Sequence, residues 1–272
     1  MNHTQIIIST SDTHLQDILI AALSEIGYDG FEQDENCLKA YIEETHFEIN
    51  ELNEIINVHQ VAFTKNIIEQ QNWNEVWESN FEPVTVDDFV GIRAHFHLPI
   101  TGVQHEIVIT PKMSFGTGHH ATTYSVMQLM KEIDFANKTV FDFGTGTGIL
   151  AILAEKLGAT EVLAVDYDDW CIENSIENIA QNNCTQIEIK KADTAITNKA
   201  YDIILANINK NIIQDNFNLL HLACDLNSFI VLSGLLIEDE TDILNLAQQK
   251  RWQHIKTIIK GAWIAVLFKV NT

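Results

Sequence analysis

The sequence predicts an α/β protein in which a doubly wound, mostly parallel sheet follows a smaller α+β domain. Three observations carry this prediction. After about residue 124 apolar strand-like runs alternate with helical patterns, the first 70 residues carry a different element order, and 272 residues are enough for two domains. Apolar residues make up 46% of the chain, more than an acidic disordered protein contains.

The first 70 residues predict a small α+β domain. Apolar side chains recur at helical spacing from Leu15 to Ile26, and Gly27 then favours a helix end. The expected elements are a strand at 6–8, a helix at 13–26, strands at 30–32 and 37–42, a helix through 47–56 and a strand at 61–68. This β-α-β-β-α-β order is that of a ferredoxin-like domain, which we assign to residues 1–70.

Residues 71–96 predict a linker helix and connecting strands. Trp73, Trp77 and Phe81 recur every four residues, which places them on one helix face that can pack on the next domain. Pro83 then ends the helix. Short β-like runs follow at 84–86, 90–96 and 106–109.

Residues 97–272 form the predicted second domain. Strands are expected at 139–143, 161–166, 187–190, 201–207 and 229–233, and helices at 149–157, 170–181, 212–222 and 239–249. The strands are continuous apolar runs, which indicates a sheet covered on both faces. Runs at 255–259 and 262–268 are separated only by Lys260 and Gly261, so we expect a C-terminal antiparallel hairpin.

The charge of the chain limits the classes of function that it can have. With 38 acidic and 16 basic residues the net charge is −22, which argues against nucleic-acid binding, including DNA. Residues 1–70 hold 13 acidic and two cationic side chains, which suits either a solvated surface or a docking module for a basic partner. No apolar run approaches the roughly 20 residues of a membrane helix, and the start lacks a signal-peptide pattern. We expect a cytoplasmic monomer without membrane contact.

The cysteines and histidines predict no metal site. Cys37, Cys171, Cys184 and Cys224 have neither metal-ligand nor redox spacing. Reduced, buried thiols are the expected state.

Five of the twelve glycines lie in two short motifs. The first, Asp142-Phe143-Gly144-Thr145-Gly146-Thr147-Gly148, follows a predicted strand and precedes a predicted helix, so its backbone can turn tightly beside a ligand. A dinucleotide fingerprint needs glycine at the sixth position from Gly144, where Ile149 stands. The spacing is instead typical of S-adenosylmethionine enzymes, although a lone glycine loop is compatible with either cofactor.

Two acidic residues follow the next strands. Asp166 ends the second strand about twenty residues after the loop, where a carboxylate can accept hydrogen bonds from both ribose hydroxyls of a nucleoside. A strand-terminal aspartate can also cap the next helix, which is the alternative reading. Asp193 follows the third strand and could meet the adenine amino group.

Two further motifs bear on the site. In Phe115-Gly116-Thr117-Gly118-His119-His120-Ala121-Thr122-Thr123 the two final threonines suit a helix start, where a hydroxyl can bond both the helix backbone and a bound carboxylate. Asn207 ends the fourth strand, and ligands of open α/β sheets bind at the carboxyl ends of strands. Its amide offers a donor and an acceptor, whereas the simpler alternative is a turn-forming asparagine.

Together these motifs resemble the PrmA-type methyltransferases, which modify ribosomal protein L-eleven. The likeness covers nearly the whole chain and includes the segments 72–77 and 81–83 and the turn at 233–235. It implies a class I methyltransferase domain with a Rossmann-like sheet and an N-terminal domain that recognises the ribosomal protein. It also implies that Thr123, Gly144, Asp166 and Asn207 are cofactor-site positions.

Two departures from the family pattern stand in this chain. His119-His120-Ala121 replaces the usual Thr-His-Pro, and Asn209 stands where leucine is usual. The first removes the rigidity of proline, and the second could alter the pocket for the incoming amine.

The hypothesis is therefore methyl transfer from S-adenosylmethionine to amino groups, lysine side chains or the N-terminal amine, of a basic large-subunit ribosomal protein, leaving S-adenosylhomocysteine. Asn207 is the expected catalytic residue, because its side-chain carbonyl or its neighbouring backbone can position a neutral amine. The alternatives are a methyltransferase of the same fold with another protein or small amine as substrate, an NAD-dependent oxidoreductase, and a non-catalytic ribosome assembly factor.

Overall fold

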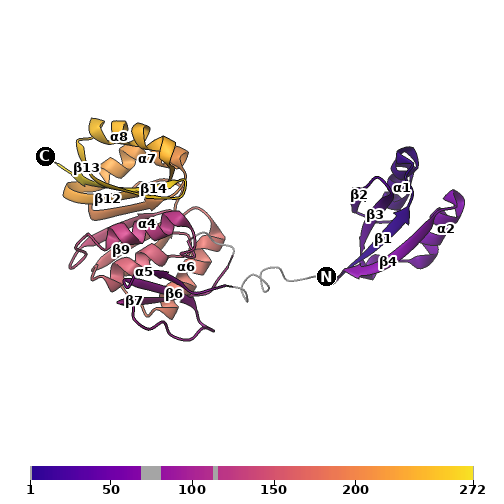
Figure 1. Ribbon diagram of the computed structural model, residues 1–272, viewed down its shortest axis with the longest axis horizontal. Helices are drawn as coiled ribbons and strands as arrows, with labels where there is room; N and C mark the ends of the chain where they lie inside the picture. Colours follow the sequence, from indigo (N-terminus) through magenta and orange to yellow (C-terminus); the bar gives the residue numbers. More distant parts are fainter. Residues whose placement is uncertain (1, 69–80, 113–115, 272) are drawn as a thin grey trace. The chain divides into compact units, whose positions relative to one another are not determined.

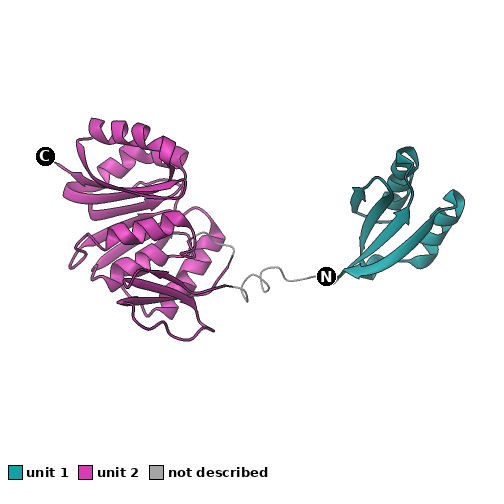
Figure 2. Ribbon diagram, in the orientation of Figure 1, with its two compact units in different colours: residues 1–76 teal, residues 77–272 magenta. Residues whose placement is uncertain are grey.

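The computed structural model describes residues 2–68, 81–112 and 116–271. The chain divides into two compact units, residues 1–76 and residues 77–272 (Figure 2). None of the helices in the described residues is long and apolar enough to cross a membrane.

Unit 1 is a four-stranded antiparallel sheet with two helices (Figure 1). Its elements are β1 (His3–Ser9), α1 (Thr13–Glu25), β2 (Gly30–Gln33), β3 (Cys37–Glu43), α2 (Ile49–His59) and β4 (Ala62–Ile68), in the sheet order β2-β3-β1-β4. Strands β1 and β3 alternate buried and partly exposed residues. The buried residues of these strands, such as Ile6 and Leu38, form the core of the unit together with buried helix residues such as Leu52 of α2.

Unit 2 contains a seven-stranded sheet in the order β10-β9-β8-β11-β12-β14-β13. The first five strands are parallel where they pair, whereas β14 is antiparallel to both β12 and β13. Its elements are α4 (Ala121–Met130), β8 (Thr139–Phe143), α5 (Ile149–Lys156), β9 (Glu161–Asp166), α6 (Asp169–Gln181), β10 (Ile187–Lys191), β11 (Tyr201–Asn207), α7 (Lys210–Leu222), β12 (Cys224–Leu236), α8 (Glu240–Gln249), β13 (Trp252–Lys260) and β14 (Trp263–Val270).

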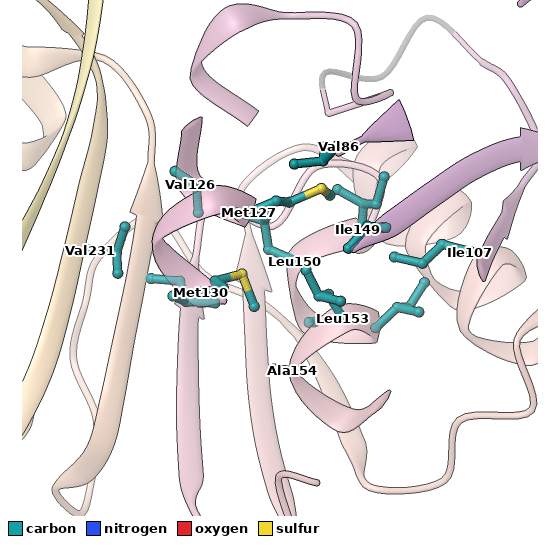
Figure 3. Close-up of a cluster of buried hydrophobic side chains, with 14 of the residues drawn as sticks. Val86, Ile107, Val126, Met127, Met130, Ile149, Leu150, Leu153, Ala154 and Val231 are labelled. Atoms are coloured by element: carbon teal, nitrogen blue, oxygen red, sulfur yellow. The ribbon is translucent and has the colours of Figure 1, made fainter. Parts of the chain in front are cut away.

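Separate hydrophobic clusters cover the two faces of this sheet. On one face α4 and α5 pack through residues such as Met127, Met130 and Leu153 (Figure 3). On the other face α7 and α8 contribute Phe217 and Ile243. Burial on both faces explains why the central strands read as unbroken apolar runs.

A second, three-stranded sheet joins the first cluster. It consists of β5 (Val84–Val86), β6 (Val90–Ala94) and β7 (His105–Ile109). The expected domain boundary at residues 96 and 97 falls between β6 and β7, which pair in parallel. Val86 and Ile107 of this sheet pack in the same cluster as α5 (Figure 3).

Two predicted segments need comment. Strand β12 is longer than the expected 229–233 at both ends. It begins at Cys224, which pairs with Tyr201 of β11, and its ladder with β14 continues past the irregularity at Ser233 to Leu236. Most of the linker helix expected from Trp73 and Trp77 lies outside the described residues. Phe81, at the end of that pattern, is buried in unit 2.

Candidate functional site

The first glycine motif forms the tight connection from β8 to α5. The backbone N–H groups of Gly144 and Thr145 both donate to the Val165 carbonyl, at 2.9 Å each, so the loop is fixed against the end of β9. Gly144 has φ +80°, and a Cβ atom there would lie 2.1 Å from Ile208 Cγ2. Only glycine therefore lets the loop approach the end of β11 this closely.

Asp142 is buried beneath this loop. Its Oδ2 accepts a hydrogen bond from Thr145 Oγ1 at 2.6 Å. Burial raises the pKa of Asp142 to about 7, the Thr145 bond opposes this rise, and the charge of Asp166 adds to it. Because the side chain is fully enclosed, we assign it to loop support.

Asp166 lies at the end of β9 and is 7% exposed. Its Oδ2 accepts from the Gly146 N–H at 2.9 Å, and its Oδ1 accepts from the Asp168 N–H at 3.1 Å. The next helix is capped instead by Asp168, whose Oδ1 accepts from the Trp170 N–H. Asp166 therefore holds the glycine loop, and each of its oxygens retains a lone pair for a ligand.

Asp193 lies two residues beyond β10 and is exposed. The N–H of its neighbour Ala192 donates to the Asp166 carbonyl at 2.9 Å, so Asp193 stands at the same edge of the sheet as Asp166.

Asn207 and Thr123 meet although 84 residues separate them. Asn207 Nδ2 donates to Thr123 Oγ1 at 3.3 Å, and the two residues are 6% and 0% exposed. Asn207 Oδ1 is buried and has no hydrogen-bond partner among the described residues. A buried amide oxygen without a partner is costly, which makes Asn207 a candidate for contact with a ligand at this edge of the sheet; Ser125 Oγ and Asp142 Oδ1 are also buried without a partner among the described residues.

The second glycine motif contacts the first. Thr147 Oγ1 donates to the Gly116 carbonyl at 2.7 Å. A Cβ atom on Gly118 would lie 2.4 Å from Ile92 Cδ1, so this residue packs closely on the small sheet. Thr117 Oγ1 lies 3.3 Å from His119 Nδ1. Phe115, also expected here, lies outside the described residues.

The segment before α4 shows how the chain accommodates the absence of proline. His120 is the N-cap residue, with φ −70° and ψ 139°, and its ring accepts from the Thr122 N–H. Ala121 is the first helical residue, the position at which proline is favoured. The backbone before Ala121 thus has the extended conformation that a following proline would impose.

Three residues of this region were not singled out by the sequence analysis. Ile208 is closely approached by both Gly144 and Gly234, and a Cβ atom on Gly234 would lie 2.2 Å from the Ile208 carbonyl oxygen. The Trp263 ring packs edge-on to His120 at 4.9 Å between centroids. Asn178 Nδ2 donates to the Thr147 carbonyl at 2.8 Å. Only the position of Ile208 after a strand-terminal asparagine gave any local signal.

Residues 5–271 match the family "Ribosomal protein L11 methyltransferase (PrmA)". The chain belongs to this family. A ribosomal protein L11 methyltransferase of Phocaeicola vulgatus is 38% identical over 264 residues, covering 93% of each chain. One from Porphyromonas gingivalis is 36% identical over 260 residues, covering 93% of this chain and 90% of the relative.

A solved structure extends the family likeness to three dimensions. The crystal structure of a ribosomal protein L11 methylase from Lactobacillus delbrueckii subsp. bulgaricus has a TM-score of 0.66 and 28% identity, and covers 71% of this chain and 100% of that one. Membership in the PrmA family makes the chain a methyltransferase, and so disfavours the oxidoreductase alternative. The seven-stranded sheet with its mixed edge is accordingly a class I methyltransferase sheet.

Proposed function

We propose that this protein transfers methyl groups from S-adenosylmethionine to amino groups of ribosomal protein L-eleven, on lysine side chains, the N-terminal amine or both. The observation that carries the proposal is the buried, unpartnered Oδ1 of Asn207 beside Thr123, at the carboxyl edge of the sheet. The PrmA-family relatives, which are named for methylation of this ribosomal protein, support the choice of substrate.

The described residues fit S-adenosylmethionine. The glycine loop would bring backbone close to the ligand, Asp166 offers acceptors for ribose hydroxyls, and Asp193, at the same edge of the sheet, would meet the adenine amino group. Gly116, Thr117 and Gly118 would border the methionine end, beside Thr123 and the loop residues Gly146 and Gly148. When bound, this cofactor supplies a methyl group already activated by a sulfonium.

The protein then has to orient a neutral amine. Asn207 Oδ1 can accept a hydrogen bond from the amine N–H while Nδ2 donates to Thr123 Oγ1. Acceptance of one N–H leaves the nitrogen lone pair free to point at the methyl carbon. The described residues hold no obvious general base beside Asn207, so we propose that the proton leaves to solvent.

The test uses labelled S-adenosylmethionine and purified large ribosomal subunits. We expect label in one ribosomal protein with the wild-type chain, and a weaker affinity for S-adenosylhomocysteine in Asp166→Ala by calorimetry. Asp168→Ala, which alters the neighbouring helix cap instead, serves as the control. Unchanged affinity in Asp166→Ala would contradict the proposed ribose contact, and label only in small molecules would contradict the protein substrate.

We further propose that unit 1 is a ferredoxin-like domain that docks the substrate. Its strand order and its excess of 13 acidic over two cationic residues within positions 1–70 support this role. An acidic domain attracts a basic ribosomal protein over a Debye length, so the association rate should fall as salt rises.

Salt dependence provides the test. Methylation of the protein substrate at subsaturating concentration should slow severalfold between about 50 and 300 mM salt. S-adenosylhomocysteine affinity measured in the same buffers is the control. A rate on the protein substrate that did not respond to salt would favour the alternative, in which the charge of residues 1–70 is only a solvated surface.

A further inference from the structure

Three asparagines lie at intervals of four residues along α6, against the outer edge of β7. Asn182 Nδ2 donates to the Val108 carbonyl at 2.6 Å, and its Oδ1 accepts from the Val108 N–H at 3.0 Å. Asn178 Oδ1 accepts from the Thr110 N–H at 2.8 Å, and Asn174 Nδ2 donates to the Thr110 carbonyl at 3.2 Å. The helix thus satisfies backbone groups that another strand would otherwise pair.

The spacing of the two elements explains this match. Four residues of a helix rise about 6 Å, and two residues of a strand rise about 6.6 Å. Asn178 and Asn182 therefore meet Thr110 and Val108 in register. Because each amide faces a backbone donor or acceptor of known kind, its orientation is set by chemistry.

Asn178 differs from the other two because it also reaches the glycine loop. Its Nδ2 donates to the Thr147 carbonyl at 2.8 Å, and it is fully buried. Thr147, also fully buried, donates through its Oγ1 to the Gly116 carbonyl. One side chain therefore joins the end of the small sheet to the first glycine motif, and through it to the second.

The loop needs such external support. Gly144, Gly146 and Gly148 all have positive φ, and glycine gives the backbone little conformational preference of its own. Two side-chain bonds hold backbone groups in the middle of the loop, one from the Gly146 N–H to Asp166 and one from Asn178 to the Thr147 carbonyl. The other bonds of the loop run from the Gly144 and Thr145 N–H groups to the Val165 carbonyl, from the Gly148 N–H to the Thr145 carbonyl, and from the two threonine hydroxyls to Asp142 and to the Gly116 carbonyl.

We propose that Asn178 is a positioning residue for the cofactor, which fixes the shape of the 144–148 loop without touching the ligand. The inference rests on the proposed function of that loop in binding S-adenosylmethionine. Loss of the Asn178–Thr147 bond should leave the loop more mobile in the cofactor-free protein and lower its affinity for the cofactor.

The chain offers a matched pair of variants. Asn178→Asp keeps the acceptor for the Thr110 N–H and removes the donor to the Thr147 carbonyl. Asn182→Asp makes the same chemical change one helical turn away, where the lost donor served the Val108 carbonyl and not the loop. Both introduce a carboxyl on the same side of the helix, but Asn178 is fully buried and Asn182 only partly, so Asn178→Asp carries the larger desolvation cost. The uncharged pair Asn178→Ala and Asn182→Ala is therefore measured beside it, and an effect of charge alone would be absent from that pair.

Two measurements separate a positioning role from a merely structural one. By calorimetry, Asn178→Asp should bind S-adenosylhomocysteine about tenfold more weakly, as expected for one lost hydrogen bond, and Asn182→Asp within about twofold of wild type. Hydrogen exchange of the cofactor-free protein should be faster over residues 144–148 in Asn178→Asp alone. At lower pH a protonated carboxyl can donate again, so the affinity of Asn178→Asp should recover toward wild type.

The outcomes are distinct. If both variants lost affinity equally, or if loop exchange were unchanged in Asn178→Asp, the inference would be overturned while weak binding by Asp166→Ala still upheld the cofactor site. If Asp166→Ala kept full affinity, the cofactor site itself and this inference with it would be overturned. Should Asn178→Asp fail to fold, Asn178→Ala against Asn182→Ala makes the same comparison with the same expected order of affinities.

Discussion

Asp142 provides the sharpest test of the energetics beneath the glycine loop. Its side chain is fully buried, and burial raises the pKa of this carboxyl from 3.8 to about 7. Such a shift corresponds to roughly 4 kcal/mol at a pH above both values. Burial of the charged form therefore destabilises the folded protein at neutral and alkaline pH.

The sign of the pH dependence follows from proton binding. Between the unfolded and folded pKa values the native state holds a proton that the unfolded state has lost, so stability falls as pH rises, by about 1.4 kcal/mol per pH unit. The stability that the folded state gains by keeping Asp142 protonated is fully present below the unfolded pKa of 3.8. It is lost as the pH rises past the folded pKa near 7. Asp142→Asn removes the titration and retains an oxygen that can accept from Thr145.

The assay is urea denaturation followed by tryptophan fluorescence, to which Trp252, buried in unit 2 against Phe217, contributes. Between pH 5 and 7 wild type should lose roughly 2 kcal/mol relative to Asp142→Asn, with little further change up to pH 8.5. Asp202→Asn is the control. Burial raises the pKa of Asp202, but hydrogen bonds from Thr139 and Lys138 outweigh burial and lower it, so Asp202 does not titrate in this range. Parallel stability curves for wild type and Asp142→Asn would refute the reasoning.

Two pairs of substitutions test the packing around the site. Leu153→Ala should destabilise unit 2 by about 2–5 kcal/mol in the same denaturation assay, because Leu153 is fully buried. Leu222 is 74% exposed, so Leu222→Ala should change the free energy of unfolding by under about 0.5 kcal/mol. Similar values for the two variants would contradict the assigned core. Gly234→Ala and Gly102→Ala share a φ near +82° to +83°, but only the first places a Cβ atom within 3 Å of backbone, at Ile208. Gly102→Ala should lower the free energy of unfolding by about 1–2 kcal/mol, from the left-handed conformation alone. Gly234→Ala should lower it clearly more and should also reduce methyl transfer, because Ile208 adjoins Asn207. Equal losses of stability would rule out the steric explanation.

Much of the fold was predictable because it depends on local patterns. The strands at 139–143, 161–166 and 201–207 were predicted with the bounds that the structure gives, since continuous apolar runs and the polar or glycine residues that end them lie within each segment. The three-strand sheet around β6 was harder to assign to a unit. Its membership in the unit 2 core depends on contacts of Val86 and Ile107 with α5, which no local pattern encodes.

In the candidate site, too, the local features were predictable and the contacts between distant segments were not. Glycine motifs and strand-terminal polar residues are local, and the sequence therefore indicated Gly144, Asp166 and Asn207. The position of each within the site, however, depends on pairings between distant segments, such as Thr123 with Asn207 across 84 residues. The asparagines of α6 illustrate the limit, since an asparagine on a helix face predicts a solvent-facing residue unless the edge of β7 is known to lie against it.

The residues that the sequence did not indicate share a physical role. Ile208 and Asn178 fix the distances between segments that carry the chemistry, Ile208 through its close contacts with Gly144 and Gly234 and Asn178 through its hydrogen bonds to Thr110 and Thr147. Such residues have no characteristic chemistry of their own, because a methyl group against glycine or an amide against a carbonyl serves equally well in any protein. Their role follows from what they hold, and it requires the whole fold before it can be assigned. Variants at these positions should therefore change ligand affinity through loop order, which hydrogen exchange detects before any ligand is added.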